Sequence, residues 1–305
     1  FDSVQLSFSS AEDNGSHFSG SSDWKVSDLQ GIDWSKSGKH DVTFKIARDA
    51  GIIECTGFVN GREGAGLFTF QANPNYQSSM TALGYPGVTT ENQFAFALHN
   101  VSLAFARDIK SAGIENANTE KLLAFRIHGV SLDFVKSMQA AGVTQKDADK
   151  LIAFRIHGVS PEFVKSMKGA GVDEKDSDKL IAFRIHGVSP EFVKGLRDAG
   201  VTTTSPDRLI AFRIHGVSPE FIKSLRNAGL SANDPDQLIA FRIHGVSAEY
   251  VQALAQLGYA HPDSEKLIAL RIHGVTPEYI QNLRSHGMQN LTLDQLVALR
   301  IHGVN

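Results

Sequence analysis

The pentapeptide Arg-Ile-His-Gly-Val recurs in this chain at a fixed interval, with its arginine at positions 126, 155, 184, 213, 242, 271 and 300. Each step is 29 residues long, and an altered copy at residues 96–102 carries Ala97 where the arginine would stand. Counted from Asn73, eight units of 29 residues follow one another without insertion or deletion. A unit this short cannot bury an apolar face alone, so the period predicts an array in which neighbouring copies stabilise one another.

The first half of each unit is typical of a helix. In residues 160–171, Ser160 can act as an N-cap, and Pro161 suits the first turn, where no backbone donor is needed. Phe163 and Met167 fall four residues apart on one apolar stripe, and the closing glycine supplies a left-handed stop. These signals predict a helix that begins after the serine and ends before the glycine.

The second half is ambiguous, because residues 151–157 alternate apolar and polar side chains as a strand would, and a leucine-rich repeat allows this period. The capping pattern favours a helix. An N-cap residue stands eight positions before each motif arginine, at Asn118, Asp147, Asp176, Ser205, Asp234, Asp263 and Thr292. An acidic residue follows two positions later, at Glu120, Asp149, Asp178, Asp207, Asp236, Glu265 and Asp294. Caps followed by first-turn acids predict a helix of about ten residues that ends at the His-Gly pair.

The fold class expected from these patterns is mainly α, an α-solenoid of eight 29-residue helix pairs over residues 73–305. In the second helix of a unit, Leu151 with Phe154 forms one apolar stripe and Ile152 with Ile156 forms another. Two stripes are expected of a helix that is packed between adjacent units. We therefore expect both stripes to be buried.

Residues 1–72 lack the period and predict a small antiparallel β domain of four to five strands that caps the solenoid. Alternating segments at residues 4–9 and 41–47, with further apolar runs up to residue 70, are separated by hairpin turns. The serine-rich stretch 9–22 is expected to be a loop. Trp24 and Trp34 are interpreted as core residues, with carbohydrate stacking as the alternative.

The motif arginines and histidines are interpreted as a structural ladder. Each histidine can hydrogen-bond an unpaired carbonyl at the end of its helix, and each arginine is expected to pair with an acidic side chain in its own or the next unit. The ladder consists of Arg126, Arg155, Arg184, Arg213, Arg242, Arg271 and Arg300 with His128, His157, His186, His215, His244, His273 and His302. The alternative is a metal or proton ladder, but stacked helices lie ~8–10 Å apart, too far for successive histidines to share one zinc ion.

The sequence contains no motif that carries chemistry. HExxH, GxSxG and CxxC are absent, and the glycine-rich segment 61–66 leads into a strand, which indicates a hairpin and not a phosphate loop. The single Cys55 lies in an expected strand with nothing to activate it. A formal net charge of −3 does not favour nucleic-acid binding, and no apolar run reaches the ~18 residues of a membrane span. We expect a protein that is not an enzyme and uses no cofactor or metal.

The string RIHGV-[ST]-PE-[FY] resembles repeats of uncharacterised bacterial exported proteins, and of the extracytoplasmic regions of some BlaR-type membrane metallopeptidases. Residues 47–76 resemble the segment that precedes such repeats. The resemblance implies a bacterial, extracytoplasmic (periplasmic or secreted) and non-catalytic repeat region.

The function expected from the sequence is a protein- or peptide-binding or scaffold module. Residues that vary between units should mark the binding surface, and in the last turn of the first helix they are Gln139, Lys168, Arg197 and Arg226. The alternative is a structural subunit that assembles head-to-tail into a filament through the open face of its last repeat, so that the partner is the chain itself.

Overall fold

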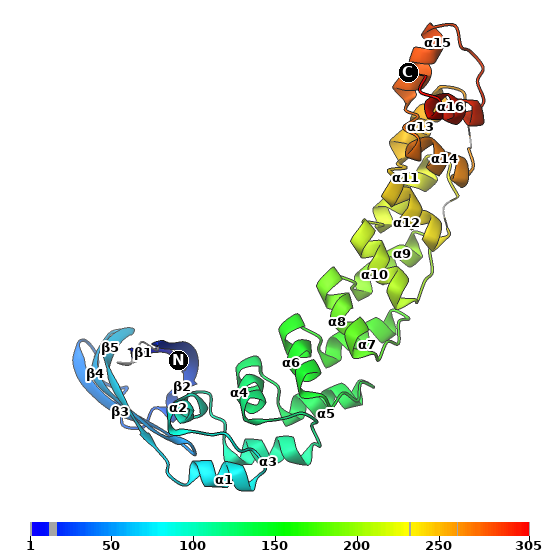
Figure 1. Ribbon diagram of the computed structural model, residues 1–305. Coiled ribbons are helices and arrows are strands. Elements are labelled where there is room, and N and C mark those ends of the chain that lie inside the picture. Colours follow the sequence, from blue (N-terminus) through cyan, green and yellow to red (C-terminus); the bar gives the residue numbers. More distant parts are fainter. Residues whose placement is uncertain (1, 12–16, 232, 261, 305) are drawn as a thin grey trace. The chain divides into compact units, whose positions relative to one another are not determined.

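The computed structural model describes residues 2–11, 17–231, 233–260 and 262–304 (Figure 1). By its internal contacts the chain divides into two compact units. The first unit comprises Phe1–Lys136 and Gln145–Arg155, and the second comprises Ser137–Thr144 and Ile156–Asn305. The change from strand to helix falls between Ala72 and Tyr76, but an independent domain over residues 1–72 remains a prediction.

Two antiparallel sheets occupy the described residues before Tyr76, which confirms the predicted β region. In one sheet β1 (Ser3–Ala11) pairs with β2 (His17–Lys25), and in the other β3 (His40–Arg48), β4 (Gly51–Asn60) and β5 (Glu63–Ala72) pair in sequence order. The segment between the sheets contains a single 3-10 turn, η1 (Val26–Asp28). The hairpin turn that joins β4 to β5 lies at the predicted position, because Asn60 pairs with Glu63 across it.

The prediction of a loop over residues 9–22 is wrong where the structure describes that segment. Residues 9–11 belong to β1 and residues 17–22 to β2, while residues 12–16 lie outside the described part of the chain. The two strands pair backbone to backbone over their whole length, and ladder hydrogen bonds do not require apolar side chains. Phe8 and Trp24, both almost fully buried, supply the packing that the serines do not.

The described residues after Ala72 form sixteen α-helices, two in each predicted 29-residue repeat. The first helices of the eight repeats are α1 (Tyr76–Ala82), α3 (Leu103–Ser111), α5 (Leu132–Ala140), α7 (Pro161–Gly169), α9 (Pro190–Asp198), α11 (Pro219–Asn227), α13 (Ala248–Gln256) and α15 (Pro277–Ser285). The second helices are α2 (Thr90–Leu98), α4 (Thr119–His128), α6 (Ala148–His157), α8 (Ser177–His186), α10 (Pro206–His215), α12 (Pro235–His244), α14 (Ser264–Ile272) and α16 (Leu293–Ile301). The helical interpretation of the second half of each repeat is confirmed.

The helix boundaries follow from the predicted caps. Asn118 and Asp176 each accept a hydrogen bond from the backbone N–H three residues later, as an N-cap does, whereas Ser205 makes no such side-chain bond. At the other end of α8 and its equivalents a glycine takes the left-handed conformation, with φ of 70° at Gly187. A residue with a Cβ would be strained there, so glycine fixes where the helix stops.

Within the second unit, helices of successive repeats pack in order. The second helices α8, α10, α12, α14 and α16 each contact the next one along the chain, and so do the first helices α7, α9, α11, α13 and α15 (Figure 1). Leu180 and Phe183 of α8 are 0% exposed, as are Leu209 and Phe212 of α10. The Leu-x-x-Phe stripe therefore forms the core between neighbouring repeats, as expected.

None of the helices in the described residues combines the length and apolar character that crossing a membrane requires.

Candidate functional site

Each motif arginine joins its helix to the preceding repeat, and we call this contact the arginine clamp. In Arg213, Nε donates a hydrogen bond to the backbone carbonyl of His186 at 3.1 Å, and the guanidinium carbon lies 4.9 Å from the centre of the Phe192 ring. The same two contacts recur at Arg126, Arg155, Arg184, Arg242, Arg271 and Arg300, with tyrosine as the ring for the last two and the Gly274 carbonyl as the acceptor for Arg300. An unpaired carbonyl at the end of one helix is thus satisfied from the next repeat.

The clamp also explains the glycine at the fourth position of the motif. A Cβ placed on Gly187 would lie 2.7 Å from Nη2 of Arg213, and the corresponding glycines Gly129, Gly158, Gly216 and Gly245 leave equally little room. Glycine at this position therefore serves two purposes. It permits the left-handed helix end, and it lets the guanidinium of the next repeat lie against the backbone.

The clamp differs from the predicted pairing of arginine with an acidic side chain. Among the described residues, the contacts of Arg155 and Arg184 are a carbonyl and a phenylalanine ring in the preceding repeat. A planar guanidinium can stack on an aromatic face and donate in its own plane at the same time. The ring and the arginine are 21 residues apart in the sequence, and the stacking of successive repeats places them side by side.

The acidic residues of the first turn instead pair with a different cation, near the N-terminal end of the second helix. The pairs within described residues are Lys121 with Asp149, Lys179 with Asp207, Arg208 with Asp236 and Lys266 with Asp294, each 28 residues apart. The hydrogen bond to aspartate raises the pKa of Lys179 and of Lys266. A charge ladder along the repeats therefore exists, but lysine supplies most of its cations.

The motif histidines contribute their backbone rather than their rings. The backbone carbonyls of His128, His157 and His186 accept the hydrogen bond of the clamp. Among the described residues, the imidazole nitrogens of these three histidines form no hydrogen bond. Their side chains are exposed. The predicted hydrogen bond from the imidazole to an unpaired carbonyl is therefore not found for these three described residues, and the arginine of the next repeat donates to the carbonyl of the histidine itself.

Isoleucine, the second residue of the motif, is exposed in every complete copy, and we call these seven residues the isoleucine row. They are 52–58% exposed and comprise Ile127, Ile156, Ile185, Ile214, Ile243, Ile272 and Ile301. The prediction that the stripe of Ile152 and Ile156 is buried is therefore wrong for Ile156, while Ile152 is half-buried. Neighbouring repeats cover the Leu-x-x-Phe stripe on the other side of the helix and leave this one open.

In the first repeat the residues at the same register are buried. Leu98 stands where the row would continue and is 4% exposed, and Ala97 stands at the arginine position and is 0% exposed. Helix α2 packs against β4 and β5, with the Phe94 ring stacked on Phe68 at 5.4 Å. Phe94 and Leu98 are four residues apart and so share a helix face. In this repeat the face that carries the row elsewhere is covered by a β-sheet.

The four variable residues predicted to mark a binding surface all lie exposed in the last turn of the first helix. The side chain of Arg197 donates to the carbonyl of Ala170, and that of Arg226 donates to the carbonyl of Gly200 and to Asn233. Lys168 forms an ion pair with Asp173 at 3.4 Å, while Gln139 is simply exposed. Two of the four thus join repeats as the clamp does. Their role in binding stays a prediction.

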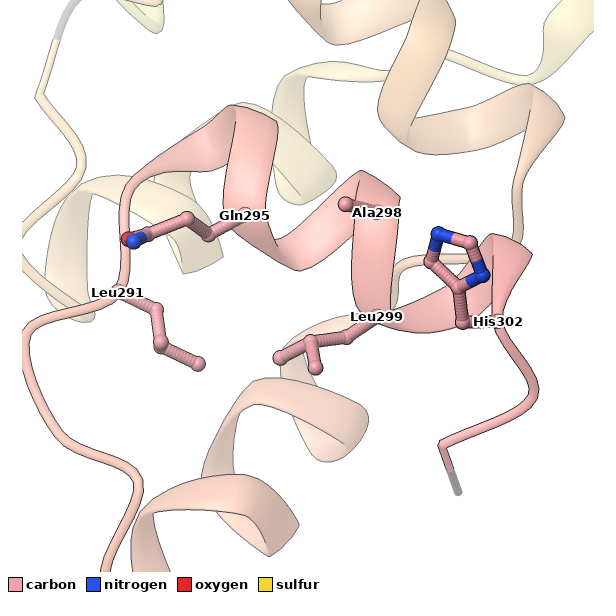
Figure 2. A pocket seen from close by; sticks show the side chains of 5 residues that line it. All are labelled: Leu291, Gln295, Ala298, Leu299 and His302. Atoms are coloured by element: carbon pink, nitrogen blue, oxygen red, sulfur yellow. The ribbon is translucent and has the colours of Figure 1, made fainter.

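A shallow hollow lies on the face of α16, lined by Leu291, Gln295, Ala298, Leu299 and His302 (Figure 2). Leu299 is half-buried, whereas the residues at its register in the two preceding repeats, Leu270 and Phe241, are 0% exposed. In those repeats the next second helix covers the position. The hollow therefore exposes part of a register that interior repeats of the second unit bury.

A larger hollow of about 640 Å³ lies in the β region, lined by residues of β1, β3, β4 and β5. Its lining is mainly apolar and includes Phe44, Phe58, Leu67 and the 39% exposed Trp34, so the core interpretation holds for Trp24 but not for Trp34. Cys55 also lines it, and burial raises the pKa of its thiol to about 11. The thiol is protonated at neutral pH and is a poor nucleophile.

Within the described residues, no three His, Cys, Asp or Glu side chains come close enough together to hold a metal ion. Comparison of the chain with protein-family models, with curated proteins and with solved structures finds no match.

Proposed function

We propose that residues 73–305 form an α-solenoid that serves as a non-catalytic scaffold for binding polypeptides, with the β region covering its first repeat. Support for the solenoid comes from the clamp, which recurs with the same geometry in both compact units, and from the ordered packing of α7–α16. A periodic array of this kind offers a long surface whose contacts repeat along it.

The observation that carries the binding function is the contrast at one register of the repeat. Leu98 is covered by a β-sheet and is 4% exposed, whereas the isoleucine row is 52–58% exposed. The chain thus contains one example of this helix face holding polypeptide, and seven copies of the face that nothing in the described structure covers. Exposed large apolar side chains repeated along one surface are typical of an interaction site.

The proposal is tested by panning a random peptide display library against the full chain. Enriched peptides should bind the wild-type chain in solution at micromolar or lower concentration, and should compete with one another for a shared surface. Failure to enrich any peptide above an unrelated immobilised protein would contradict a polypeptide-binding function.

A second candidate is head-to-tail assembly, which the hollow on α16 favours. The face there binds another helical repeat in this proposal, since Leu299 stands at a register that interior repeats bury completely. Light scattering at increasing protein concentration should then show growing particles, and Leu299→Asp should abolish the growth. A mass that is independent of concentration would rule out this candidate.

We also propose an extracytoplasmic, bacterial location, which only the resemblance of the repeat motif supports. Fractionation of cells that express the full-length natural protein would test it, and recovery in the cytoplasm alone would contradict it.

A further inference from the structure

We propose that the part of the isoleucine row that lies in the second compact unit, together with the motif arginines of that unit, binds an acidic polypeptide segment whose apolar side chains recur about every 9 Å. This inference rests on the proposed binding function and specifies the surface and the chemistry of the partner. It is carried by three features of the repeats: the exposure of the row, the fate of the arginine in the covered repeat, and the charges around each clamp.

The first feature is the constancy of the residue type along the row. Seven of seven complete copies have isoleucine at this position although more than half of the side chain is exposed. Other exposed positions of the repeat do vary, as Gln139, Lys168 and Arg197 illustrate at equivalent places. The half-buried residue four positions earlier, Ile152 in α6, adjoins the row on the same helix face and widens the apolar surface.

The second feature is what happens to the arginine when this face is covered. In the first repeat the chain places Ala97 at that position and covers the face with β4 and β5. A guanidinium buried without an acceptor is strongly unfavourable, so a covered face either lacks the arginine or brings it a partner. The later repeats keep the arginine. In Arg213 the clamp hydrogen bond uses Nε–H, so a partner that covers this face must supply acceptors for the other guanidinium N–H groups.

The third feature is that carboxylates of the repeats near the clamp already interact with other groups of the chain. In Arg213 the Nε–H donates to His186, which leaves the remaining guanidinium donors at an exposed side chain. Asp207 and Asp236 of the second helices pair with Lys179 and Arg208, and hydrogen bonding to its own backbone and to Ser189 lowers the pKa of Glu191, a glutamate that follows the motif. Carboxylates of a partner complement the clamp best, because they bind arginine through two oxygens.

The spacing of the repeats indicates the spacing of apolar side chains in the partner. Packed helices lie ~8–10 Å apart, which sets the interval between successive isoleucines. A polyproline II segment presents every third side chain on one face at intervals of ~9.3 Å. A peptide with a Leu-Glu-Pro repeat would place one leucine and one glutamate at every isoleucine and arginine of the second unit.

The test measures fluorescence anisotropy of a labelled 18-residue peptide of six Leu-Glu-Pro triplets against the full chain. Matched peptides carry lysine or glutamine in place of glutamate. We expect the acidic peptide to bind most tightly, at least ~10-fold more tightly than the lysine peptide, and to weaken as salt is raised. Equal binding of the lysine peptide would overturn the proposed acidic partner.

Substitution of the row provides the second arm. The triple variant I185S/I214S/I243S should weaken binding of the acidic peptide at least ~10-fold, because apolar contact is lost in three repeats. The control is Leu67→Ser, an exposed apolar residue of β5, which should leave the affinity unchanged. Circular dichroism should show both variants folded. Unchanged binding by the folded triple variant, or an equal loss in the control, would overturn the assignment of the surface.

Two further outcomes separate this inference from its premise. If panned peptides bind but are not acidic, or bind the triple variant equally well, the inference fails and the binding function stands. If no peptide is enriched and the Leu-Glu-Pro peptide does not bind, the binding function itself fails. A wild-type dimer that the triple variant abolishes, seen by sedimentation equilibrium, would instead assign the row to a second copy of the chain.

Discussion

The first repeat and the later repeats are built on one helical frame but use one of its faces in opposite ways. In α2 that face carries Phe94, Ala97 and Leu98 and is packed on a sheet, whereas in α10 it carries Arg213 and Ile214 and is exposed. The core stripe keeps its phenylalanine in both, as Phe96 and Phe212, whereas the leucine of the later repeats is Gln93 in the first, which donates to the carbonyls of Ala50 and Asn73. The difference shows that stacking of the repeats does not require this face to be covered, and that in the first repeat a β-sheet of the same chain packs against it.

The largest effect should come from placing the later residue in the first repeat. Ala97→Arg would bury a guanidinium at a position that is 0% exposed, in a helix that packs against β4 and β5. Burial of an unpaired charge costs about 3–5 kcal/mol, and displacement of packed side chains adds to it. Urea unfolding followed by tryptophan fluorescence in the β region would measure the loss. A variant as stable as the control Ala97→Ser would show that the face is not covered.

The same contrast should appear when apolar contact is removed. Leu98→Ala is expected to cost about 2–5 kcal/mol, since it leaves a cavity against the sheet. Ile214→Ala removes a side chain that is 57% exposed and should cost less than about 1 kcal/mol. Equal decreases in the melting temperature of the two variants would contradict the difference in covering between Leu98 and Ile214.

Substitution of a clamp arginine should lower the free energy of unfolding moderately. Arg213→Ala removes a cation–π contact and a hydrogen bond to His186, a loss of about 1–2 kcal/mol. Arg213→Lys keeps the charge but lacks the planar fork, and should be intermediate in stability. Hydrogen exchange at the end of α8 would report the opening. If lysine were as stable as arginine, a charge interaction and not the clamp geometry would hold the repeats together.

The smallest expected effect is a dependence of stability on pH, to which equivalent glutamates of several repeats contribute. Hydrogen bonds from the backbone and the N-cap serine lower the pKa of Glu162, Glu191 and Glu220 from the ordinary 4.5. A folded-state pKa below the unfolded value gives stability that is present above pH 4.5 and is lost as the pH falls through the lowered value. Thermal melts between pH 5 and pH 3 should show this decline. The double variant E191Q/E220Q should decline less steeply than the wild type.

Helix boundaries could be predicted from the sequence because they depend on local signals. Asp176, which caps α8, and Gly187, which ends it, act within a few residues of their own positions. The mutual covering of the repeats could not be predicted in the same way. A ten-residue helix with Leu151 and Phe154 on one side and Ile152 and Ile156 on another does not indicate which stripe a neighbour covers. The exposure of the second stripe became evident only from the packing.

The partner of the arginine was mispredicted for a similar reason. The nearest visible signal in the sequence was the acidic residue of the first turn, and the structure pairs that residue with a lysine of the preceding repeat. One signal was present, since Phe192 precedes Arg213 by 21 residues as Phe163 precedes Arg184. Strand β2 was missed because its serines suggest a loop, while its pairing depends on the backbone.

The contrast in covering can be measured directly by hydroxyl-radical footprinting of the full chain, with oxidation rates normalised to those of the unfolded chain. Leu98 should be strongly protected, whereas Ile214 and Ile243, which fall in distinguishable tryptic peptides, should be oxidised at more than a third of their unfolded rates. Comparable protection of all three residues would contradict the account, because the isoleucine row would then already be covered.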